Sequence, residues 1–269
     1  MNKIGIFIPC YNVENSIRGV LNSFSQRTLQ EVNQILAVDN CSKDRTFDIL
    51  KEAKGLKETL GRKLIIIKNA ENYGLGGSQK IAYQYFLDNG FTHFIIVHGD
   101  GQGDGEAIVR NFFKVFDQQP DIDVILASRF ISGGDISSYN HLRTVGNWAF
   151  NVITFLCTGY WMTDAGTAVI FYRTAILKDV PFSDLTNSFQ FNPELNILLH
   201  ALKGVKIKEI PLSWKDSEDA SNIRALDYCW TLLKILVGYR LNLTFMNKAG
   251  YRLFHSAPQT ISPKIDVLK

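Results

Sequence analysis

Short apolar runs alternate with amphipathic patterns through the first half of the chain. The apolar runs predict β-strands over residues 4–8, 34–38, 63–67, 94–97 and 123–127. The stretches between them predict helices over residues 16–25, 45–53, 76–87 and 106–116. Strands that alternate with helices are joined by right-handed crossovers and form a mainly parallel sheet. The pattern therefore predicts an α/β fold, with a twisted sheet flanked by helices.

The rhythm changes after about residue 130. The pattern there predicts a helix over 142–156, a strand over 167–172, a helix over 193–202 and a strand over 205–212. Because this half lacks an alternation of its own, we expect it to complete the same sheet. The chain then divides into one domain over residues 1–221 and a C-terminal helical extension with a tail over 222–269. The tail after Ser256 is rich in Pro, Ser and Lys, which predicts loose order.

Composition narrows the class of protein. The chain has 269 residues, 46% of them apolar and 20% charged, which is typical of a globular protein with one large core. The net charge of +3 is too small to argue for a nucleic-acid partner. The four cysteines are scattered without metal-type pairing, and the first residues lack a signal-peptide core. These features predict a cytoplasmic protein with reduced thiols.

The helix predicted over 226–245 bears on membrane contact. Neither it nor any other segment reaches eighteen uninterrupted apolar residues, so no transmembrane helix is predicted. Its interior carries Lys234 and Arg240, and Arg224, Lys248 and Arg252 flank it. An apolar stripe of this kind usually packs against a core, but with basic groups it also fits a membrane surface. Peripheral contact at the inner face of a membrane therefore stays open.

The most informative turn follows the strand at 94–97. It reads His98-Gly99-Asp100-Gly101-Gln102, and a helix begins soon after it. In an α/β protein Asp100 then lies at the carboxyl end of a buried parallel strand, where ligand crevices form. A carboxylate among glycines can hold a hard cation that bridges phosphates. The alternative is an ordinary Asp-Gly turn.

Other strand ends carry candidate ligand contacts. Tyr11 can stack on a base or sugar, although a tyrosine near a turn is more often packing. Asp39 can accept a hydrogen bond from a base, whereas Ser42 and Asp44 fit helix capping better. The glycine-rich segment 72–78 can bring a helix N-terminus to a nucleotide or form a plain tight turn. The first strand lacks the Gly-x-Gly-x-x-Gly turn, which argues against a dinucleotide-dependent oxidoreductase.

These segments, in this order, resemble the family 2 glycosyltransferases of the GT-A fold, and among them the dolichol-phosphate mannosyltransferase and polyprenyl-phosphate glycosyltransferase type. The resemblance runs from about Ile4 to Ser221. It is carried by Pro9-Cys10-Tyr11-Asn12, Val38-Asp39 with Ser42 and Asp44, Asn72-Tyr73-Gly74 with Gly76, Asp100-Gly101-Gln102, Ala127-Ser128-Arg129-Phe130, Asp164-Ala165-Gly166-Thr167, Glu194-Leu195 and Glu209-Ile210-Pro211-Leu212.

The resemblance implies roles for individual residues. It places Asp100 and Gln102 at a Mg²⁺ or Mn²⁺ ion on the donor diphosphate. It places Asp164 and Glu194 beside the sugar and the acceptor. A hydroxyl acceptor needs a carboxylate to take its proton, so Asp164 is the first candidate base and Glu194 the second, with an ion pair or a helix cap as the alternative for both. Contacts with the nucleotide-sugar are implied for Pro9, Tyr11, Asn12, Glu14, Asp39, Asn72, Gly77, Ser78, Gly99 and Arg129.

The activity that the resemblance implies is inverting transfer of a sugar from a UDP- or GDP-sugar to a polyprenyl-phosphate or glycan acceptor, in cell-envelope polysaccharide or glycolipid assembly. The Gln-x-x-Arg-Trp signature of processive synthases is absent, which favours transfer of a single sugar. His98 stands where the family's metal motif usually begins with an aspartate. A catalytically weak nucleotide-sugar-binding or regulatory protein on the same scaffold is therefore the alternative function.

Overall fold

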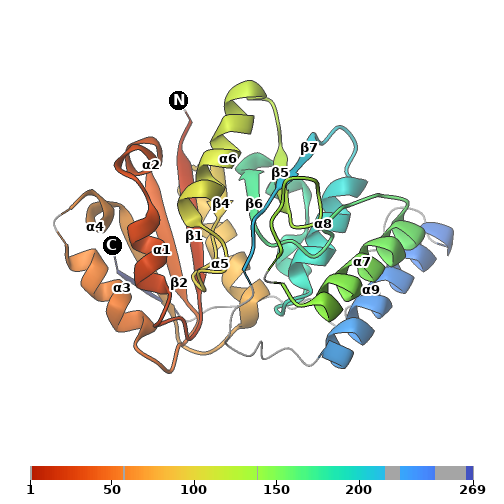
Figure 1. Cartoon of the computed structure of the whole chain (residues 1–269), viewed down its shortest axis with the longest axis horizontal. Helices are drawn as coiled ribbons and strands as arrows, with labels where there is room; N and C mark the ends of the chain where they lie inside the picture. The colour runs from red at the N-terminus through yellow and green to blue at the C-terminus, as the bar shows by residue number, and fades with distance from the viewer. Residues whose placement is uncertain (1, 57, 138, 216–224, 246–264, 269) are drawn as a thin grey trace.

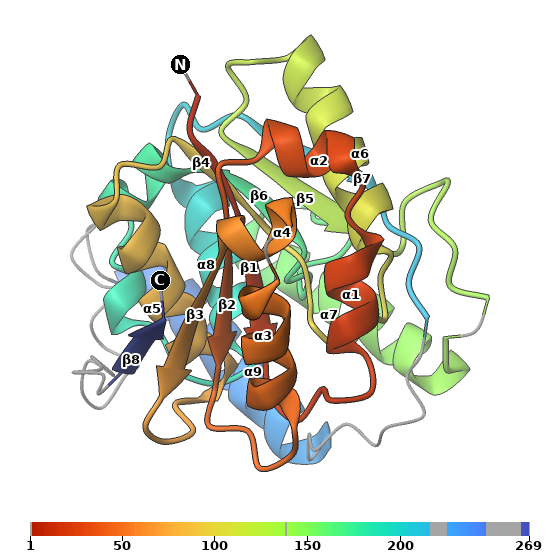
Figure 2. The same cartoon turned by 90° about the vertical axis from the view of Figure 1, so that its left-hand side faces the viewer.

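A computed structural model describes residues 2–56, 58–137, 139–215, 225–245 and 265–268. An eight-stranded sheet with the order β7-β5-β6-β4-β1-β2-β3-β8 runs through the molecule (Figures 1 and 2). Its strands are β1 (Ile4–Cys10), β2 (Gln34–Asp39), β3 (Leu64–Asn69), β4 (His93–Ile96), β5 (Val124–Ser128), β6 (Ile170–Arg173), β7 (Ile207–Pro211) and β8 (Ile265–Leu268). One sheet thus spans both halves of the chain, as the sequence predicts.

Helices cover both faces of this sheet. They are α1 (Ile17–Ser23), α2 (Gln26–Glu31), α3 (Thr46–Gly55), α4 (Thr59–Lys63), α5 (Gly74–Asp88), α6 (Gly105–Gln118), α7 (His141–Thr158), α8 (Phe191–Ala201) and α9 (Ala225–Phe245), with short 3-10 turns at Thr174–Asp179 and Phe182–Asp184. One apolar layer unites α1 to α4 and α6, and the other unites α5, α8 and the 3-10 turns. The helices α7 and α9 pack together at one side of the molecule (Figure 1).

The strand pairing is mainly parallel. β1 pairs in parallel with β2 and β4, β2 with β3, and β5 with β7. β6 is antiparallel and lies between β4 and β5, so β5 reaches the rest of the sheet through β6. The predicted architecture, a mainly parallel twisted sheet flanked by helices, is confirmed.

Side-chain alternation along β1 explains why both layers form. Ile6 and Ile8 enter one core, whereas Phe7 between them enters the other, as the period of two in a strand requires. Gly5 lies on the second face, where an added Cβ would come within 2.4 Å of the Phe86 ring. The glycine is therefore needed for α5 to approach the sheet closely.

Helix boundaries follow local capping. Asp104 accepts a hydrogen bond from the Ala107 N–H and begins α6, and Asn140 accepts bonds from two backbone N–H groups and begins α7. α7 ends at Gly159, whose φ of 79° is a left-handed conformation that glycine adopts without strain. The helix predicted over 142–156 is thus confirmed and extends a little at both ends.

The structure differs from the sequence-based expectations in two places. The helix predicted over 16–25 is confirmed as α1, whereas α2 and α4 lie where no helix was expected. The prediction of loose order in the tail was wrong for residues 265–268, which form β8 and pair antiparallel with β3. Three of its four residues, Ile265, Val267 and Leu268, are apolar, and two of these are of the β-branched kind common in strands. The rest of the tail, residues 246–264, lies outside the described residues.

The predicted helix over 226–245 is confirmed as α9. Leu236 and Tyr239 are buried in a small apolar cluster with Met162 and Ile197, and Leu232 is buried too, so α9 packs against the protein as expected of a core-facing helix. The domain boundary predicted at residue 221 falls among residues 216–224, outside the described part of the chain, and the division into two domains stays a prediction. Arg224, Lys248 and Arg252 also lie outside it.

His93, a buried histidine at the amino end of the central strand β4, predicts how the stability of the protein depends on pH. His93 is 4% exposed and stacks on Phe171, and burial lowers its pKa to about 4. Since the unfolded chain binds this proton near pH 6.5, the stability from His93 is present above that pH and is lost toward pH 4. Between about pH 7 and pH 4.5, wild type should lose roughly 2 kcal/mol more unfolding free energy than His93→Phe, measured by urea titration. Equal losses in the two proteins would show that His93 is not the sensor.

Candidate active site

The carboxyl ends of β1, β2 and β4 meet at one edge of the sheet. Cys10 is in register with Asp39, and the Asn40 N–H donates to the Cys10 carbonyl at 2.9 Å. The Gly99 N–H donates to the Pro9 carbonyl at 3.3 Å, and a Cβ on Gly99 would approach that oxygen to 2.9 Å. Glycine at this position therefore lets the two strand ends come together.

Carboxylates gather around this junction. Burial raises the pKa of the Cys10 thiol well above its ordinary value, and the charges of Asp39 and Asp100 raise it further. Both acids thus lie near the end of β1. Asp39 is fully buried, and its Oδ1 accepts a bond of 3.4 Å from the Ser42 N–H, whereas its Oδ2 has no partner among the described residues. Burial also raises the pKa of Asp39.

The loops after β1 and β2 clasp each other through side chains. The Asn12 N–H donates to Ser42 Oγ at 3.0 Å, and the Lys43 N–H donates back to Asn12 Oδ1 at 2.8 Å. Asn12 has a φ of 52°, a left-handed conformation that asparagine tolerates. Glu14 repeats the clasp, because its Oε2 accepts from the Arg45 N–H at 3.0 Å. Asn12 and Glu14 thus fix the shape of the edge on which the half-buried Tyr11 lies.

The glycine-rich turn after β3 packs inside the protein. The Gly77 N–H donates to the Asn187 carbonyl at 3.0 Å, and a Cβ on Gly74 would lie 2.3 Å from that same oxygen. Ser78 is 1% exposed and accepts from Asn69. The turn contacts the segment around Asn187, so the tight-turn interpretation fits it better than a free helix N-terminus. The donor contacts predicted for Gly77 and Ser78 have no support in this geometry.

Asn72 joins the loop after β3 to the loop after β2 through its side chain. Its Oδ1 accepts from Asn40 Nδ2 at 2.7 Å and from the Gly74 N–H at 2.8 Å. Asn40 in turn accepts from the Tyr73 N–H and from Asn69 Nδ2, both at 2.9 Å. Asn72 therefore holds the loops after β2 and β3 in place at the same edge.

The central turn is fastened to the segment that follows β7. Asp100 is half-buried and its Oδ1 accepts from the Gln102 N–H at 3.1 Å. Gln102 Nε2 donates to the Lys215 carbonyl at 3.0 Å. This bond uses the amide nitrogen, so the amide oxygen Oε1 can act as an acceptor or ligand toward a bound group. His98 packs edge-on against the Trp214 ring, with 5.9 Å between ring centroids. At the position where the resembling family usually has an aspartate, this chain thus has a histidine that packs against an aromatic ring.

The residues at this turn fit a hard cation only in part. Carboxylate and amide oxygens from Asp100 and Gln102 suit Mg²⁺ or Mn²⁺. Among the described residues, however, no group of three or more His, Cys, Asp or Glu side chains is placed to hold a metal. A cation here would need the phosphate oxygens of a bound ligand to complete its coordination.

Arg129 and Asp164 form a buried ion pair beyond the end of β5. Arg129 Nε donates to Asp164 Oδ2 at 2.8 Å, and Nη2 donates to Oδ1 at 2.9 Å, in a bidentate arrangement. Asp164 is 1% exposed. Burial opposes the charge of Arg129, but Asp164 more than compensates and keeps the pKa of the guanidinium above its ordinary value. Both carboxylate oxygens are therefore engaged, and a base role for Asp164 would require this pair to open.

Two tyrosines that sequence reasoning missed surround this pair. Arg129 Nη1 donates to Tyr139 Oη at 3.1 Å. Burial raises the pKa of Tyr228 to about 12, and its phenol lies within the electrostatic reach of Arg129, Asp164 and Tyr139. Because Tyr228 belongs to α9 and lies almost a hundred residues from Arg129, no local sequence signal joins the two.

Glu194 lies inside the protein. It is fully buried in the first turn of α8, and its Oε2 accepts from the Thr186 N–H at 2.9 Å. Burial lowers the pKa of Lys80 to about 8, and the charge of Glu194 acts against that shift. Lys80 also donates to the Leu185 carbonyl. These contacts fit the structural alternative for Glu194 better than proton transfer to an acceptor.

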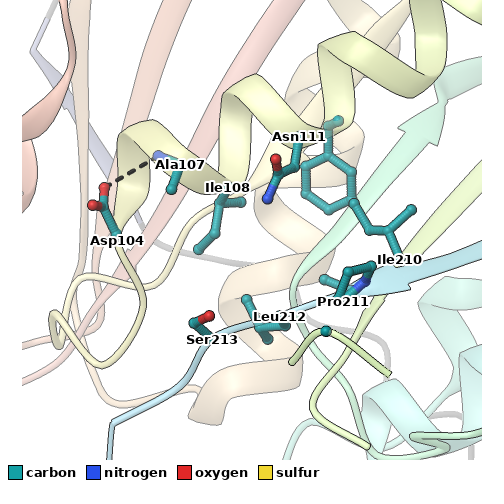
Figure 3. Close-up of a pocket in the computed structure, with 11 residues that line it drawn as sticks. Asp104, Ala107, Ile108, Asn111, Ile210, Pro211, Leu212 and Ser213 are labelled. Atoms are coloured by element: carbon teal, nitrogen blue, oxygen red, sulfur yellow. Dashed lines mark hydrogen bonds between the residues drawn. The ribbon is translucent and has the colours of Figure 1, made fainter. Parts of the chain in front are cut away.

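A pocket of about 100 Å³ lies between the start of α6 and the end of β7 (Figure 3). Its labelled walls are mostly apolar, with Ile108, Ile210 and Leu212 among them. Asp104, which also lines it, caps α6 through the Ala107 N–H. The pocket contains none of the residues predicted for the donor, the metal or the base.

Comparison with known proteins identifies the family to which this chain belongs. The model of glycosyl transferase family 2 matches residues 5–180. The chain therefore belongs to family 2 of the glycosyltransferases and is an enzyme of that family.

Named relatives are similar over most of the chain. It is 26% identical over 183 residues to a UDP-N-acetylglucosamine–dolichyl-phosphate N-acetylglucosaminyltransferase of Methanococcus voltae, covering 65% of this chain and 71% of the relative. It is 21% identical over 217 residues to an undecaprenyl-phosphate mannosyltransferase of Micrococcus luteus, covering 80% and 85%. It is 25% identical over 239 residues to a dolichyl-phosphate beta-glucosyltransferase of Saccharomyces cerevisiae, covering 83% and 70%.

Solved structures share the fold. Glucosyl-3-phosphoglycerate synthase of Mycobacterium tuberculosis, solved with Mn²⁺ and UDP-glucose, has a TM-score of 0.60 at 12% identity, over 93% of this chain and 81% of that one. S. aureus TarS, solved with UDP-GlcNAc, has a TM-score of 0.51 at 18% identity, over 93% and 75%.

Proposed function

We propose that this enzyme transfers one sugar from a UDP-sugar to a polyprenyl phosphate, with inversion and with the help of a divalent cation. The observation that carries the proposal is the meeting of Asp39 and Asp100 at the joined ends of β1, β2 and β4. The relatives named for dolichyl or undecaprenyl phosphate support the acceptor class. The UDP-bound structures of the same fold support the donor class.

Asp39 fits the base of the donor. Its buried Oδ2, which lacks a partner among the described residues, can accept a hydrogen bond from an N–H of uracil. A buried acceptor left without a donor costs about 1–3 kcal/mol, so a base that supplies one should bind favourably. Pro9 and Tyr11 at the end of β1 then flank the nucleoside, as the family resemblance implies.

Asp100 and Gln102 would hold the cation on the donor diphosphate. A bound Mg²⁺ or Mn²⁺ would neutralise the charge that develops on the leaving UDP. In the transfer, an acceptor phosphate oxygen attacks the anomeric carbon, and the bond from that carbon to the diphosphate oxygen breaks with its electron pair. This chain's residues align the two substrates for that displacement.

A phosphate acceptor also suits the Arg129–Asp164 pair. A phosphate is already anionic and needs no base, so the engagement of both Asp164 oxygens by Arg129 does not obstruct the reaction. We assign Asp164 the task of holding Arg129, whose remaining N–H groups can donate to a phosphate oxygen. This assignment replaces proton transfer by Asp164 with positioning.

Peripheral membrane contact is the proposed means of reaching a lipid acceptor. Large apolar side chains are exposed on α7, on α9 and at Trp161 just after α7. We call this set the α7–α9 patch: Leu142, Val145, Trp148, Phe155, Leu156, Trp161, Trp230, Leu233, Val237 and Leu241. Residues 136–163 contain no Asp or Glu, whereas Arg143, Lys234 and Arg240 are exposed on the two helices. Exposed tryptophans beside cations suit the interface of an anionic membrane. In the described part of the chain, no helix has the length and apolarity needed to cross a bilayer.

Vesicle flotation tests this contact. Wild type should float with vesicles of phosphatidylglycerol and phosphatidylcholine, and Trp148→Ala, Trp161→Ala and Trp230→Ala combined should lower that binding at least about tenfold, because each change removes a large amphipathic ring. Leu56→Ala, an exposed apolar residue after α3, is the control and should bind as wild type does. Absence of flotation by the wild type at low and high salt would contradict membrane contact.

Transfer assays test the function itself. The purified chain is offered UDP- and GDP-sugars with Mn²⁺ and a short-chain polyprenyl phosphate, and the lipid-linked sugar is detected by mass spectrometry. We expect product with a UDP-sugar and inversion at its anomeric carbon. Thermal stabilisation by UDP without any turnover would instead favour the regulatory alternative.

A further inference from the structure

The loop that carries Asp164 is fastened by a carboxylate from the next strand. The Thr163 N–H donates to Glu209 Oε1 and the Thr163 hydroxyl donates to Glu209 Oε2, each at 2.8 Å. Thr163 Oγ also lies 2.6 Å from Ser128 Oγ. Since the single Thr163 hydroxyl proton goes to the carboxylate, the Ser128 hydroxyl is the donor in that contact. A chain of hydrogen bonds therefore runs from β7 through the loop to the end of β5.

These hydrogen bonds reach the neighbours of both residues of the Arg129–Asp164 pair. Thr163 precedes Asp164 in sequence, and Ser128 precedes Arg129. The Arg129 N–H also donates to Asp164 Oδ2 at 3.1 Å, so the Asp164 carboxylate is bound to the backbone of Arg129 as well as to its side chain. Movement of Thr163 would displace Asp164, and with it the guanidinium that Asp164 orients.

Other side chains support the same loop, but none has the position of Glu209. Asn151 Nδ2 donates to the Thr163 carbonyl and Asn196 Nδ2 to the Ala165 carbonyl, at 2.6 and 3.1 Å. Glu209 alone among these three carries a carboxyl group and reaches, through Thr163, the residue before Arg129. Hydrogen bonds to a charged acceptor are the stronger kind.

We propose that Glu209 is a positioning residue that sets the geometry of the Arg129–Asp164 pair through Thr163 and Ser128. The inference rests on the proposed function, in which this pair borders the acceptor phosphate. Glu209 touches neither substrate and acts through the pair alone. Misplacement of a catalytic group by about 1 Å can cost about a hundredfold in rate, so such a support has a measurable effect.

Two variants and a matched control test this role. Glu209→Ala removes both bonds to Thr163. Glu209→Gln keeps them without the charge, because its amide oxygen can accept from the Thr163 N–H while its NH₂ donates to the Thr163 hydroxyl. Glu106→Ala is the control, since Glu106 accepts from the Ser25 N–H at 3.0 Å and from Ser25 Oγ at 2.6 Å, a like pair of bonds at α6.

Hydrogen exchange tests whether Glu209 holds Thr163, which we call the Glu209 clamp, and it needs no activity assay. We expect the Thr163 amide to exchange at least about tenfold faster in Glu209→Ala than in wild type, with Glu209→Gln in between, because the bond that protects it is lost. Glu106→Ala should leave this amide unchanged. Unchanged exchange in Glu209→Ala would overturn the clamp, whatever reaction the enzyme performs.

Kinetics test whether the clamp acts through the ion pair. In transfer assays Glu209→Ala should lower kcat by about ten- to a hundredfold with little change in KM for the UDP-sugar, and Glu209→Gln should recover most of it. In an Asp164→Asn background, Glu209→Ala should have little further effect, because the pair is already broken. Additive losses in that double variant would overturn action through Asp164. If wild type itself transfers no sugar, the proposed function fails, and the exchange measurement still decides whether Glu209 holds the loop.

Discussion

Asp100→Asn should lower metal-dependent transfer by about a thousandfold, which corresponds to about 4 kcal/mol of lost transition-state stabilisation. Asp100 is the carboxylate that the central turn offers to a cation on the donor diphosphate, and asparagine removes its charge with almost no change of shape. The fold should survive, because asparagine can still accept from the Gln102 N–H as Asp100 does now. Steady-state rates over a range of Mn²⁺ concentrations, with thermal unfolding alongside, measure both effects.

Asp104→Asn is the control for this substitution. Asp104 lies on the same turn and caps α6 through the Ala107 N–H, a task that asparagine performs about as well. We expect near-normal transfer and stability from it. Near-normal rates in Asp100→Asn would remove that residue from the metal site, whereas equal losses in both variants would point to a general effect of charge at the turn.

Asp164→Asn should weaken both the fold and the reaction. It leaves the Arg129 guanidinium buried without its counter-charge, which should lower the unfolding free energy by about 3 kcal/mol. We also expect kcat to fall by roughly a hundredfold while the affinity for UDP stays close to that of wild type, since the proposed donor contacts lie at the ends of β1 and β2. Urea titration, calorimetric UDP titration and transfer kinetics measure the three quantities.

The matched control is Asp123→Asn. Asp123 pairs with Arg173 at 3.0 Å, but this pair is partly exposed and lies at the opposite end of β5 and β6. Its loss should cost less stability, because exposed ion pairs contribute little, and should leave transfer unchanged. Unchanged transfer in Asp164→Asn would show that its pair with Arg129 serves the fold alone.

Most of the sheet could be predicted because its strands are buried on both faces. The first five apolar runs stand out for that reason, and their order sets the crossovers. β8 could not be predicted in the same way, since it is four residues long and its pairing with β3 depends on a distant segment. α4 escaped notice because five residues hold too little of a helical period to show one.

The candidate site was predictable where chemistry follows a strand directly. Asp39 and Asp100 both lie near the end of β1, because the carboxyl ends of parallel strands share one edge of the sheet, and their roles toward a ligand stay predictions. Side chains that bond to backbone could not be distinguished from ligand contacts, and Asn12 is an example, because an amide serves either purpose. Glu209 was visible only as part of a family motif, since its partner Thr163 lies far away in sequence and no spacing rule connects them.

The place of β6 in the sheet has a consequence for how the molecule is made. On the ribosome, β1 to β4 can assemble as soon as they emerge, but β5 has no neighbour until β6, some forty residues later, inserts beside it. Glu209 arrives later still. We therefore expect nascent chains that end near residue 130 to protect β1 to β4 from proteolysis while the segment of β5 stays open to it.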